Sequence, residues 1–181
     1  MTRKPVIIML TAALLMSVAA WGQSLPKFKF GEPTMEELKM TTYDKDSSAA
    51  AVVLLNLRDV GFRLDGGEIT EVTTNRFRIK ILKDAGKDYA NVDHVLYNSQ
   101  GAKGHEKIFG IKAVAINLEN GKVVKTKMKS DMIFTEKIDE YHDRVKFTIP
   151  QAKVGSVIEY EYNVSSDLYY QMDDWNAQQP I

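Results

Sequence analysis

The most regular pattern in the chain is an alternation of apolar and basic residues over residues 74–82. Phe77, Ile79 and Ile81 alternate there with three basic residues, which are Arg76, Arg78 and Lys80. A period of two places successive side chains on opposite faces of a β-strand, so this segment is predicted to be a strand with one apolar and one cationic face. Two interpretations of the cationic face stay open: a solvated face that keeps a sheet soluble and deters edge-to-edge pairing, or an anion-binding surface.

Further strands follow from alternation and from the turn residues that separate short apolar runs. Residues 156–165 are the most amphipathic segment, since one predicted face carries Ile158, Tyr160, Tyr162 and Val164. Asn120-Gly121 predicts a type I′ turn, because Asn-Gly tolerates positive φ at both central positions, and it would join residues 111–118 and 122–127 as an antiparallel pair. The other predicted strands are 50–55, 60–64, 130–138 and 144–149, whereas residues 89–97 show no clear period.

Helical signals are restricted to one short segment. Thr34 and Glu37 have the spacing of a capping box and predict a short helix over residues 34–40. About eight short strands separated by turns, with no helix long enough for parallel crossovers, favour an antiparallel sandwich or an open barrel over a βαβ architecture. The predicted fold is therefore mainly β, an antiparallel β-sandwich with one short N-terminal helix.

The first residues have the layout of a secretory signal peptide. Arg3 and Lys4 precede an apolar run from Val6 to Ala20, and Ala20-Trp21-Gly22 places small residues where a signal peptidase requires them. The run is shorter than the roughly 20 apolar residues of a membrane span, so an uncleaved anchor is the second interpretation. We expect a signal peptide at 1–22, an extended lead-in at 23–33 and one domain at 34–181, exported and soluble after cleavage.

Charge and cysteine content exclude several classes of function. The 24 basic residues balance 24 acidic residues, which argues against a nucleic-acid partner, since such proteins concentrate Lys and Arg. The chain has no Cys, so it offers no thiol nucleophile, cysteine zinc site, iron–sulfur cluster, disulfide or lipid-modified cysteine. No Gly-x-Ser-x-Gly elbow and no glycine-rich phosphate loop is present, and no cofactor is predicted.

The three histidines are the remaining candidates for catalysis or metal binding. His94 lies among apolar residues and His105 in a polar loop, and no two histidines have ligand spacing. His142 belongs to a cluster that could surround a divalent cation if its loop folded back, but an ordinary solvated turn is the favoured interpretation; the cluster comprises Glu136, Asp139, Glu140, His142 and Asp143. We therefore predict no catalytic, cofactor-binding or metal-binding residue.

Aromatic residues gather beside acids near the C-terminus. Tyr169, Tyr170, Asp174 and Trp175 are candidates for contact with a carbohydrate or a protein partner, because aromatic side chains with polar tips are frequent at interfaces. The alternative is that they pack onto parts of the domain beyond Ile181.

Several segments in order resemble a family of exported bacterial domains of unknown function, DUF3857. The similar segments are Lys29-Phe30-Gly31 with Thr34-Met35-Glu36-Glu37-Leu38, then 43–54, 78–83, 112–122, 147–150, 155–162 and Asp174-Trp175. The resemblance implies a β-sandwich module placed before a transglutaminase-like (papain-type) domain in exported proteins of Gram-negative bacteria. It also implies that the chain stops inside its own domain at the C-terminus, which would leave an unpaired sheet edge and exposed apolar surface.

The family offers no established catalytic residues to carry over, and a transglutaminase-like Cys–His–Asp site cannot form without Cys. The function expected is a non-catalytic scaffold, periplasmic or on the outer surface, that presents substrate to the downstream domain. Another exported protein, a peptide or a cell-wall glycan are further expected partners. The alternative is a stand-alone glycan- or protein-binding domain.

Overall fold

A computed structural model describes residues 28–99, 101 and 104–168. One short α-helix, α2, spans Met35–Lys39, and two 3₁₀ helices, η1 and η2, span Asp84–Ala90 and Ser130–Met132. The eight strands are β1 (Ala51–Asp65), β2 (Glu68–Ile81), β3 (Asn91–Tyr97), β4 (Glu106–Glu119), β5 (Lys122–Lys127), β6 (Ile133–Lys137), β7 (His142–Thr148) and β8 (Val157–Ser166).

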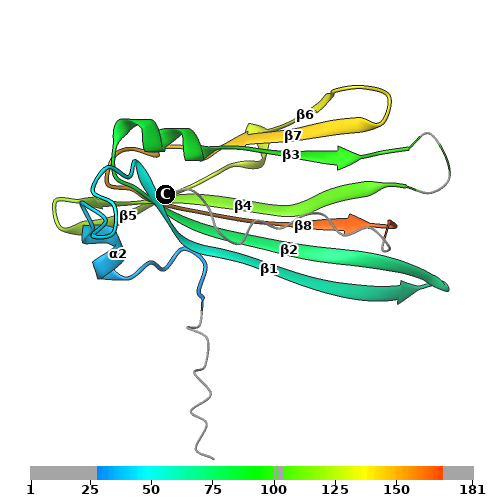
Figure 1. Cartoon of the computed structure of the whole chain (residues 1–181), viewed down its shortest axis with the longest axis horizontal. Coiled ribbons are helices and arrows are strands. Elements are labelled where there is room, and N and C mark those ends of the chain that lie inside the picture. The colour runs from blue at the N-terminus through cyan, green and yellow to red at the C-terminus, as the bar shows by residue number, and fades with distance from the viewer. Residues whose placement is uncertain (1–27, 100, 102–103, 169–181) are drawn as a thin grey trace, which may run out of the picture.

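The strands form two antiparallel sheets that pack face to face. The larger sheet has the order β1-β2-β8-β4-β5 and the smaller one the order β3-β7-β6, which lies above the larger sheet in Figure 1. Every strand pair is antiparallel. The predicted mainly β sandwich with one short helix is confirmed.

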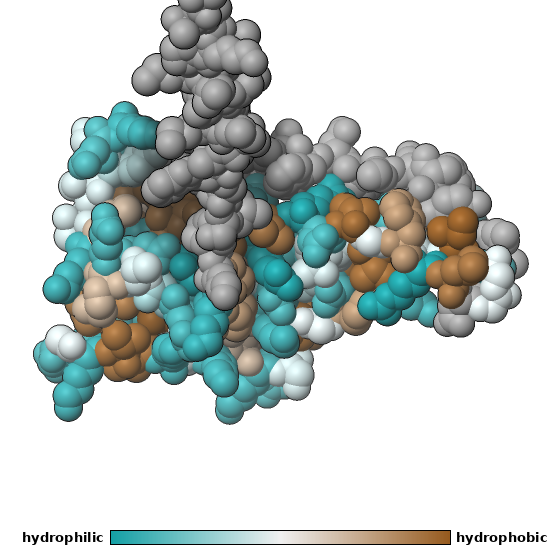
Figure 2. Space-filling view, turned by 90° about the horizontal axis from the view of Figure 1, so that it is seen from below, coloured by the Kyte–Doolittle hydropathy of each residue, from teal (hydrophilic) through white to brown (hydrophobic). Residues whose placement is uncertain are grey.

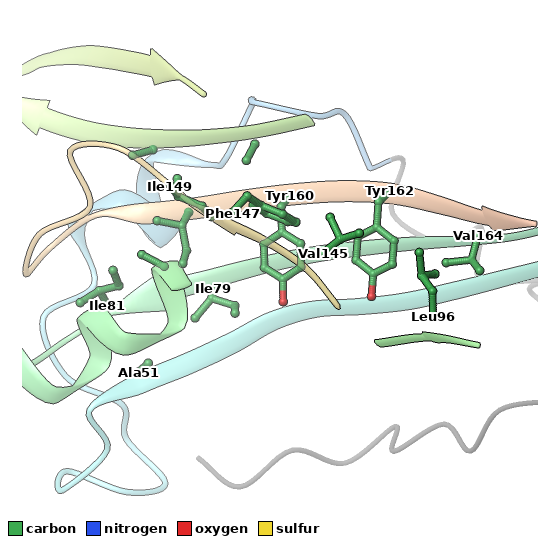
Figure 3. Packing of buried hydrophobic residues seen from close by; sticks show 14 residues of the cluster. Ala51, Ile79, Ile81, Leu96, Val145, Phe147, Ile149, Tyr160, Tyr162 and Val164 are labelled. Atoms are coloured by element: carbon green, nitrogen blue, oxygen red, sulfur yellow. The ribbon is translucent and has the colours of Figure 1, made fainter. Parts of the chain in front are cut away.

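The main core lies between the two sheets. Phe77 of β2 stacks on Tyr160 of β8 with ring centroids 4.7 Å apart, and Phe147 of β7 meets Tyr160 edge-on at 5.9 Å. Tyr160 and Tyr162 lie side by side on β8, with hydroxyl groups that point the same way (Figure 3). The apolar face predicted for residues 156–165 is therefore the face of β8 that enters the core.

Two local predictions are confirmed in detail. Asn120 and Gly121 join β4 to β5 with φ values of 50° and 76°, as a type I′ turn requires. At α2, the Thr34 side chain accepts a hydrogen bond from the Glu37 amide, and the Glu37 carboxylate accepts one from the Thr34 amide. Both signals depend only on neighbouring residues, which is why the sequence shows them.

Two predictions of element boundaries were wrong. Residues 50–55 and 60–64 were expected as separate strands, but they form the single strand β1, with a bulge between Val53 and Leu55. β1 pairs with β2 along its whole length, and this pairing keeps the polar residues between the two apolar runs extended. The local sequence does not show such pairing, so it could not predict one continuous strand. Residues 130–138 were expected as one strand, but Ser130–Met132 form η2 and β6 begins only at Ile133. The segment 89–97, which showed no clear period, contributes β3.

Two predictions concern residues outside those that the structure describes. The signal peptide at 1–22 and the C-terminal limit of the domain both fall there. Within the described ranges, no helix is both long and apolar enough to span a bilayer.

Candidate functional site

The cationic face of β2 is covered by the chain's own N-terminal segment. Residues 28–40, here called the N-terminal cover, lie across the outer face of the larger sheet, opposite the main core. Leu38 and Phe30 of the cover pack against Val114, Ile116 and Val157 of the sheet. Arg78 is only 8% exposed and Lys80 is 0% exposed, so the prediction of a solvated basic face was wrong for these two residues.

Arg78 is the centre of the contact between sheet and cover. Its Nε donates to Glu159 Oε1 at 2.9 Å, and its Nη1 lies 3.1 Å from Glu37 Oε2. Its Nη2 donates to the backbone carbonyls of Lys29 and Glu32, both at 3.2 Å. The cationic face of β2 thus does bind anionic and carbonyl groups, but those it binds here come from the same chain.

Glu159 is fully buried on β8 and is held from two directions. One carboxylate oxygen accepts from Arg78, and the other accepts from the Gly31 amide of the cover at 2.6 Å. Burial raises the pKa of Glu159, and the Gly31 amide and the Arg78 charge oppose that rise. The carboxylate depends on these two donors, because a buried charge without partners is costly.

Lys80 is held by backbone carbonyls. Its Nζ donates to Leu38 O of α2 at 2.7 Å and to Gly155 O at 2.6 Å. Carbonyl dipoles compensate a charge less than a carboxylate does, and burial lowers the pKa of Lys80 from 10.5 to about 8. Lys80 therefore fastens the end of α2 to the start of β8.

The third basic residue of the row, Arg76, lies at the open side of this contact. Its Nε is 3.0 Å from Glu161 Oε2, and Lys112 Nζ is 3.1 Å from the other oxygen of the same carboxylate. The Arg76 side chain is 35% exposed, so water screens this group far more than it screens Arg78. For Arg76 the prediction of a solvent-facing cation holds in part.

One hollow lies beside this contact, and another lies on the core side of the larger sheet. The first, of about 500 Å³, is bounded by the cover and by β4 and β5, and we call it the lysine groove; its lining residues are Phe30, Gly31, Ile111, Lys112, Ala113, Val114, Lys125, Lys127 and Met128. The other, of about 330 Å³, is lined by Tyr160 with residues of η1 and β3, among them Asp88, Tyr89 and Asp93. Sequence reasoning missed both, because neither set of residues is contiguous in the chain.

The family follows from a match to its profile. The family described as "Domain of Unknown Function with solved-structure structure (DUF3857)" matches residues 69–180. This chain belongs to the DUF3857 family. The matched region contains Arg78, Lys80 and Glu159, so the sheet side of the contact lies within the DUF3857 region. The N-terminal cover precedes it.

Beyond the family match, the similarity of this DUF3857 chain to known proteins is limited. No curated protein matches it. It is similar to a crystal structure from Parabacteroides distasonis described as a "putative protease", with 13% sequence identity and a TM-score of 0.49 over 65% of this chain. The chain spans 23% of the length of that protein.

The structure separates the acidic groups around His142 in this DUF3857 chain. His142 Nδ1 lies 2.9 Å from Asp139 Oδ1, whereas Glu136 pairs with Lys146 at 2.6 Å and Asp143 accepts from the Asn98 side chain. Across the described residues, no group of three or more His, Asp or Glu side chains could hold a metal ion. Glu136 belongs to β6, and His142 and Asp143 belong to β7, so only Asp139 and Glu140 of this cluster lie in the turn between the two strands.

The other sequence candidates have different outcomes. His94 is half-buried with its ring 5.3 Å from that of Tyr162, and His105 Nε2 lies 2.9 Å from Gly101 O. The proposed contact residues Tyr169, Tyr170, Asp174 and Trp175 lie outside the described residues. One signal in the sequence of this DUF3857 chain could have indicated the buried contact. Glu159 and Glu161 alternate on β8 with the period of the basic residues on β2, and their direct partners there are Arg78 and Arg76.

Burial of Lys80 predicts an unusual dependence of stability on pH. Between about pH 8 and pH 10.5 the unfolded chain keeps a proton on Lys80 that the folded chain has lost. The free energy of unfolding is therefore expected to rise with pH in this range, by up to about 1.4 kcal/mol per pH unit. Urea titrations at a series of pH values measure this slope.

Lys80→Met is the matched control, because it removes the titrating group and keeps an unbranched side chain that is one atom shorter. Its free energy of unfolding should be nearly flat over the same range. The titrations stop below pH 10.0, the ordinary pKa of tyrosine, because burial raises the pKa of Tyr160 and thereby lowers stability at higher pH. Equal slopes for wild type and Lys80→Met would contradict the assignment.

Proposed function

We propose that this chain is a non-catalytic module of a protein exported by a Gram-negative bacterium. In this proposal it scaffolds a transglutaminase-like (papain-type) domain and presents substrate to it, in the periplasm or at the outer surface. The signal-peptide pattern at 1–22 supports export, and the family resemblance supports the choice of partner. Because the chain has no Cys, the nucleophile of such a site must come from the partner domain.

One observation carries the scaffolding role: the β1–β2 hairpin ends in an exposed apolar patch. β2 pairs with β8 only from Glu71 onward, and Glu71 is the partner of Phe62, so residues 63–70 extend beyond the rest of the sheet. Phe62, Leu64 and Ile69 continue the row of β1 and β2 positions that elsewhere faces the core, yet they are 58%, 75% and 41% exposed. Figure 2 shows hydrophobic residues at the right-hand end of the molecule, toward which the hairpin extends in Figure 1.

A contiguous exposed apolar patch of this kind marks an interaction site in soluble proteins. Leu64 and Ile69 are direct partners across the hairpin, and Phe62 lies two residues along the same face. The three side chains therefore form one continuous surface on a two-stranded element. We assign this surface to contact with the transglutaminase-like domain.

Site-specific photo-cross-linking in the source bacterium tests this contact. A photoreactive phenylalanine analogue replaces Leu64, or Val154 as the control, which is 51% exposed in the loop before β8. Mass spectrometry then identifies the peptides joined to each position. We expect peptides of a transglutaminase-like domain from position 64 and none from position 154. Absence of such peptides at position 64, or equal recovery from both positions, would refute the assignment.

The double substitution Phe62→Ser with Leu64→Ser provides an independent prediction. We expect it to change the free energy of unfolding by no more than about 0.5 kcal/mol per residue, because both side chains are exposed. It should reduce the cross-linked adduct formed from a third patch position, Ile69, at least about fivefold. A large loss of stability instead would show that the patch packs within the folded domain.

A further inference from the structure

The lysine groove crosses an open edge of the larger sheet. β5 ends at Lys127, which is the partner of Val114, and the Met128 amide then donates to Ala113 O at 2.9 Å. Among the described residues, the part of β4 before Ala113 has no strand partner on that side. Ile111 belongs to this unpaired part and lies beside the groove.

Side chains from both faces of β4 line the groove. Ile111 and Ala113 belong to the core side, whereas Lys112 and Val114 belong to the outer side. A hollow bounded by both faces of one strand must pass over the edge of that strand. Such an edge offers backbone donors and acceptors to an added strand. The register of β4 shifts between Phe109 and Lys112, where Gly110 has a φ of 65°, so an added strand meets a bulged edge at Ile111.

Positive charge surrounds this edge. Lys125 and Lys127 share the outer face of β5, because their partners on β4 are Ile116 and Val114. Both lysines are exposed, and neither forms an ion pair in the part of the chain that the structure describes. Lys112 contributes a third ammonium group, which it shares with Glu161.

The floor of the groove is apolar, and its size suits a short segment. Phe30, Ile111 and Met128 supply apolar surface that is only partly buried by the fold. A volume of about 500 Å³ lies within the usual range of ligand sites. An occupant must therefore combine main-chain hydrogen-bonding groups, apolar side chains and carboxylates.

We propose that the lysine groove binds an acidic peptide in extended conformation. The peptide adds as a strand to the open edge of β4 at Ile111, its apolar side chains contact Phe30 and Met128, and its carboxylates meet Lys125 and Lys127. The site lies near the end of the molecule where β5 and α2 are found, away from the tip of the β1–β2 hairpin (Figure 1). The proposal does not depend on the hairpin contact, so the two can fail separately.

Fluorescence anisotropy with the full chain tests the proposal. The probe is a labelled eight-residue peptide in which Glu alternates with Val, and a peptide of alternating Lys and Val is its control. We expect saturable binding of the acidic peptide and none of the basic one. Equal binding of both peptides, or no binding of the acidic one, would overturn the proposal.

Charge substitutions locate the site. Lys125→Glu with Lys127→Glu should weaken binding of the acidic peptide by about tenfold or more, and Lys125→Gln with Lys127→Gln by less. Lys122→Glu is the matched control, because Lys122 lies on the same strand, is exposed and does not line the groove. It should change the affinity less than about twofold. If Lys122→Glu weakens binding as much as the groove substitutions do, the peptide does not occupy this groove.

Strand addition has its own test. Methylation of alternate backbone nitrogens in the acidic peptide removes main-chain donors and keeps every carboxylate, so we expect it to weaken binding about tenfold or more. Unchanged affinity after methylation would overturn strand addition. Displacement of the peptide by inorganic phosphate at equal concentration would also overturn the proposal, because it would show a simple anion site.

Discussion

Replacing Arg78 with alanine is expected to lower the free energy of unfolding by about 3–5 kcal/mol. After the substitution, the fully buried Glu159 carboxylate keeps only one of its two hydrogen-bond donors, the Gly31 amide. It also removes the donors to the backbone of the N-terminal cover and the ion pair with Glu37. Urea unfolding followed by circular dichroism measures the loss.

Arg76→Ala is the matched control for this prediction. Arg76 lies two residues away on the same strand and face, but its side chain is 35% exposed and Glu161 keeps Lys112 as a second partner. Its loss should cost no more than about 1 kcal/mol. Comparable losses for the two alanine variants would contradict the central role of Arg78.

A second variant separates charge burial from the loss of packing. Adding Glu159→Gln to Arg78→Ala should recover part of the lost stability, because a neutral amide leaves no uncompensated buried charge. If the double variant is less stable than Arg78→Ala by the full cost of Glu159→Gln alone, the two residues do not interact energetically.

Replacing Gly86 with alanine is expected to destabilise the domain by about 3 kcal/mol or more. A Cβ atom at this position of η1 would clash with the backbone oxygen of Ala50. That carbonyl cannot easily move, because it accepts hydrogen bonds from the amides of Leu82 and Lys83 at 2.8 and 2.9 Å. Thermal and urea unfolding of Gly86→Ala measure the effect.

Gly61→Ala is the control for Gly86→Ala. No atom lies within 4 Å of a Cβ built at Gly61, which is in β1 of the exposed hairpin. Removing a glycine from a strand reduces the entropy of the unfolded chain, so this variant should be unchanged or slightly stabilised. A Gly86→Ala variant as stable as Gly61→Ala would show that η1 can move away from Ala50.

Much of the secondary structure could be predicted because its signals are local. The period of two in residues 74–82 and 156–165 predicted β2 and β8 and assigned the core face of each correctly. The capping box at Thr34 and the turn at Asn120 were equally reliable, since each depends on two to four neighbouring residues. The prediction of two separate strands at 50–55 and 60–64 was wrong, because pairing with the long strand β2 keeps both segments in the single strand β1.

The candidate sites were much less accessible to sequence reasoning. The alternation in β2 predicted that its basic residues share one face. It could not predict that the N-terminal cover buries this face, because the contacting residues Arg78 and Glu37 are 41 positions apart in the chain. The lysine groove likewise combines the segment around Phe30 with β4 and β5. Neither the exposed hairpin nor the open edge of β4 can be recognised before the strand order is known.

By itself the sequence determined the alternating faces, the hairpin turn, the helix cap and membership of a mainly β class. Only the tertiary structure decided that Arg78 and Lys80 are buried, that Phe62 and Leu64 are exposed, and that β4 has an open edge. The physical reason is that periodicity records which side chains share a face, whereas burial depends on what the rest of the chain places over that face.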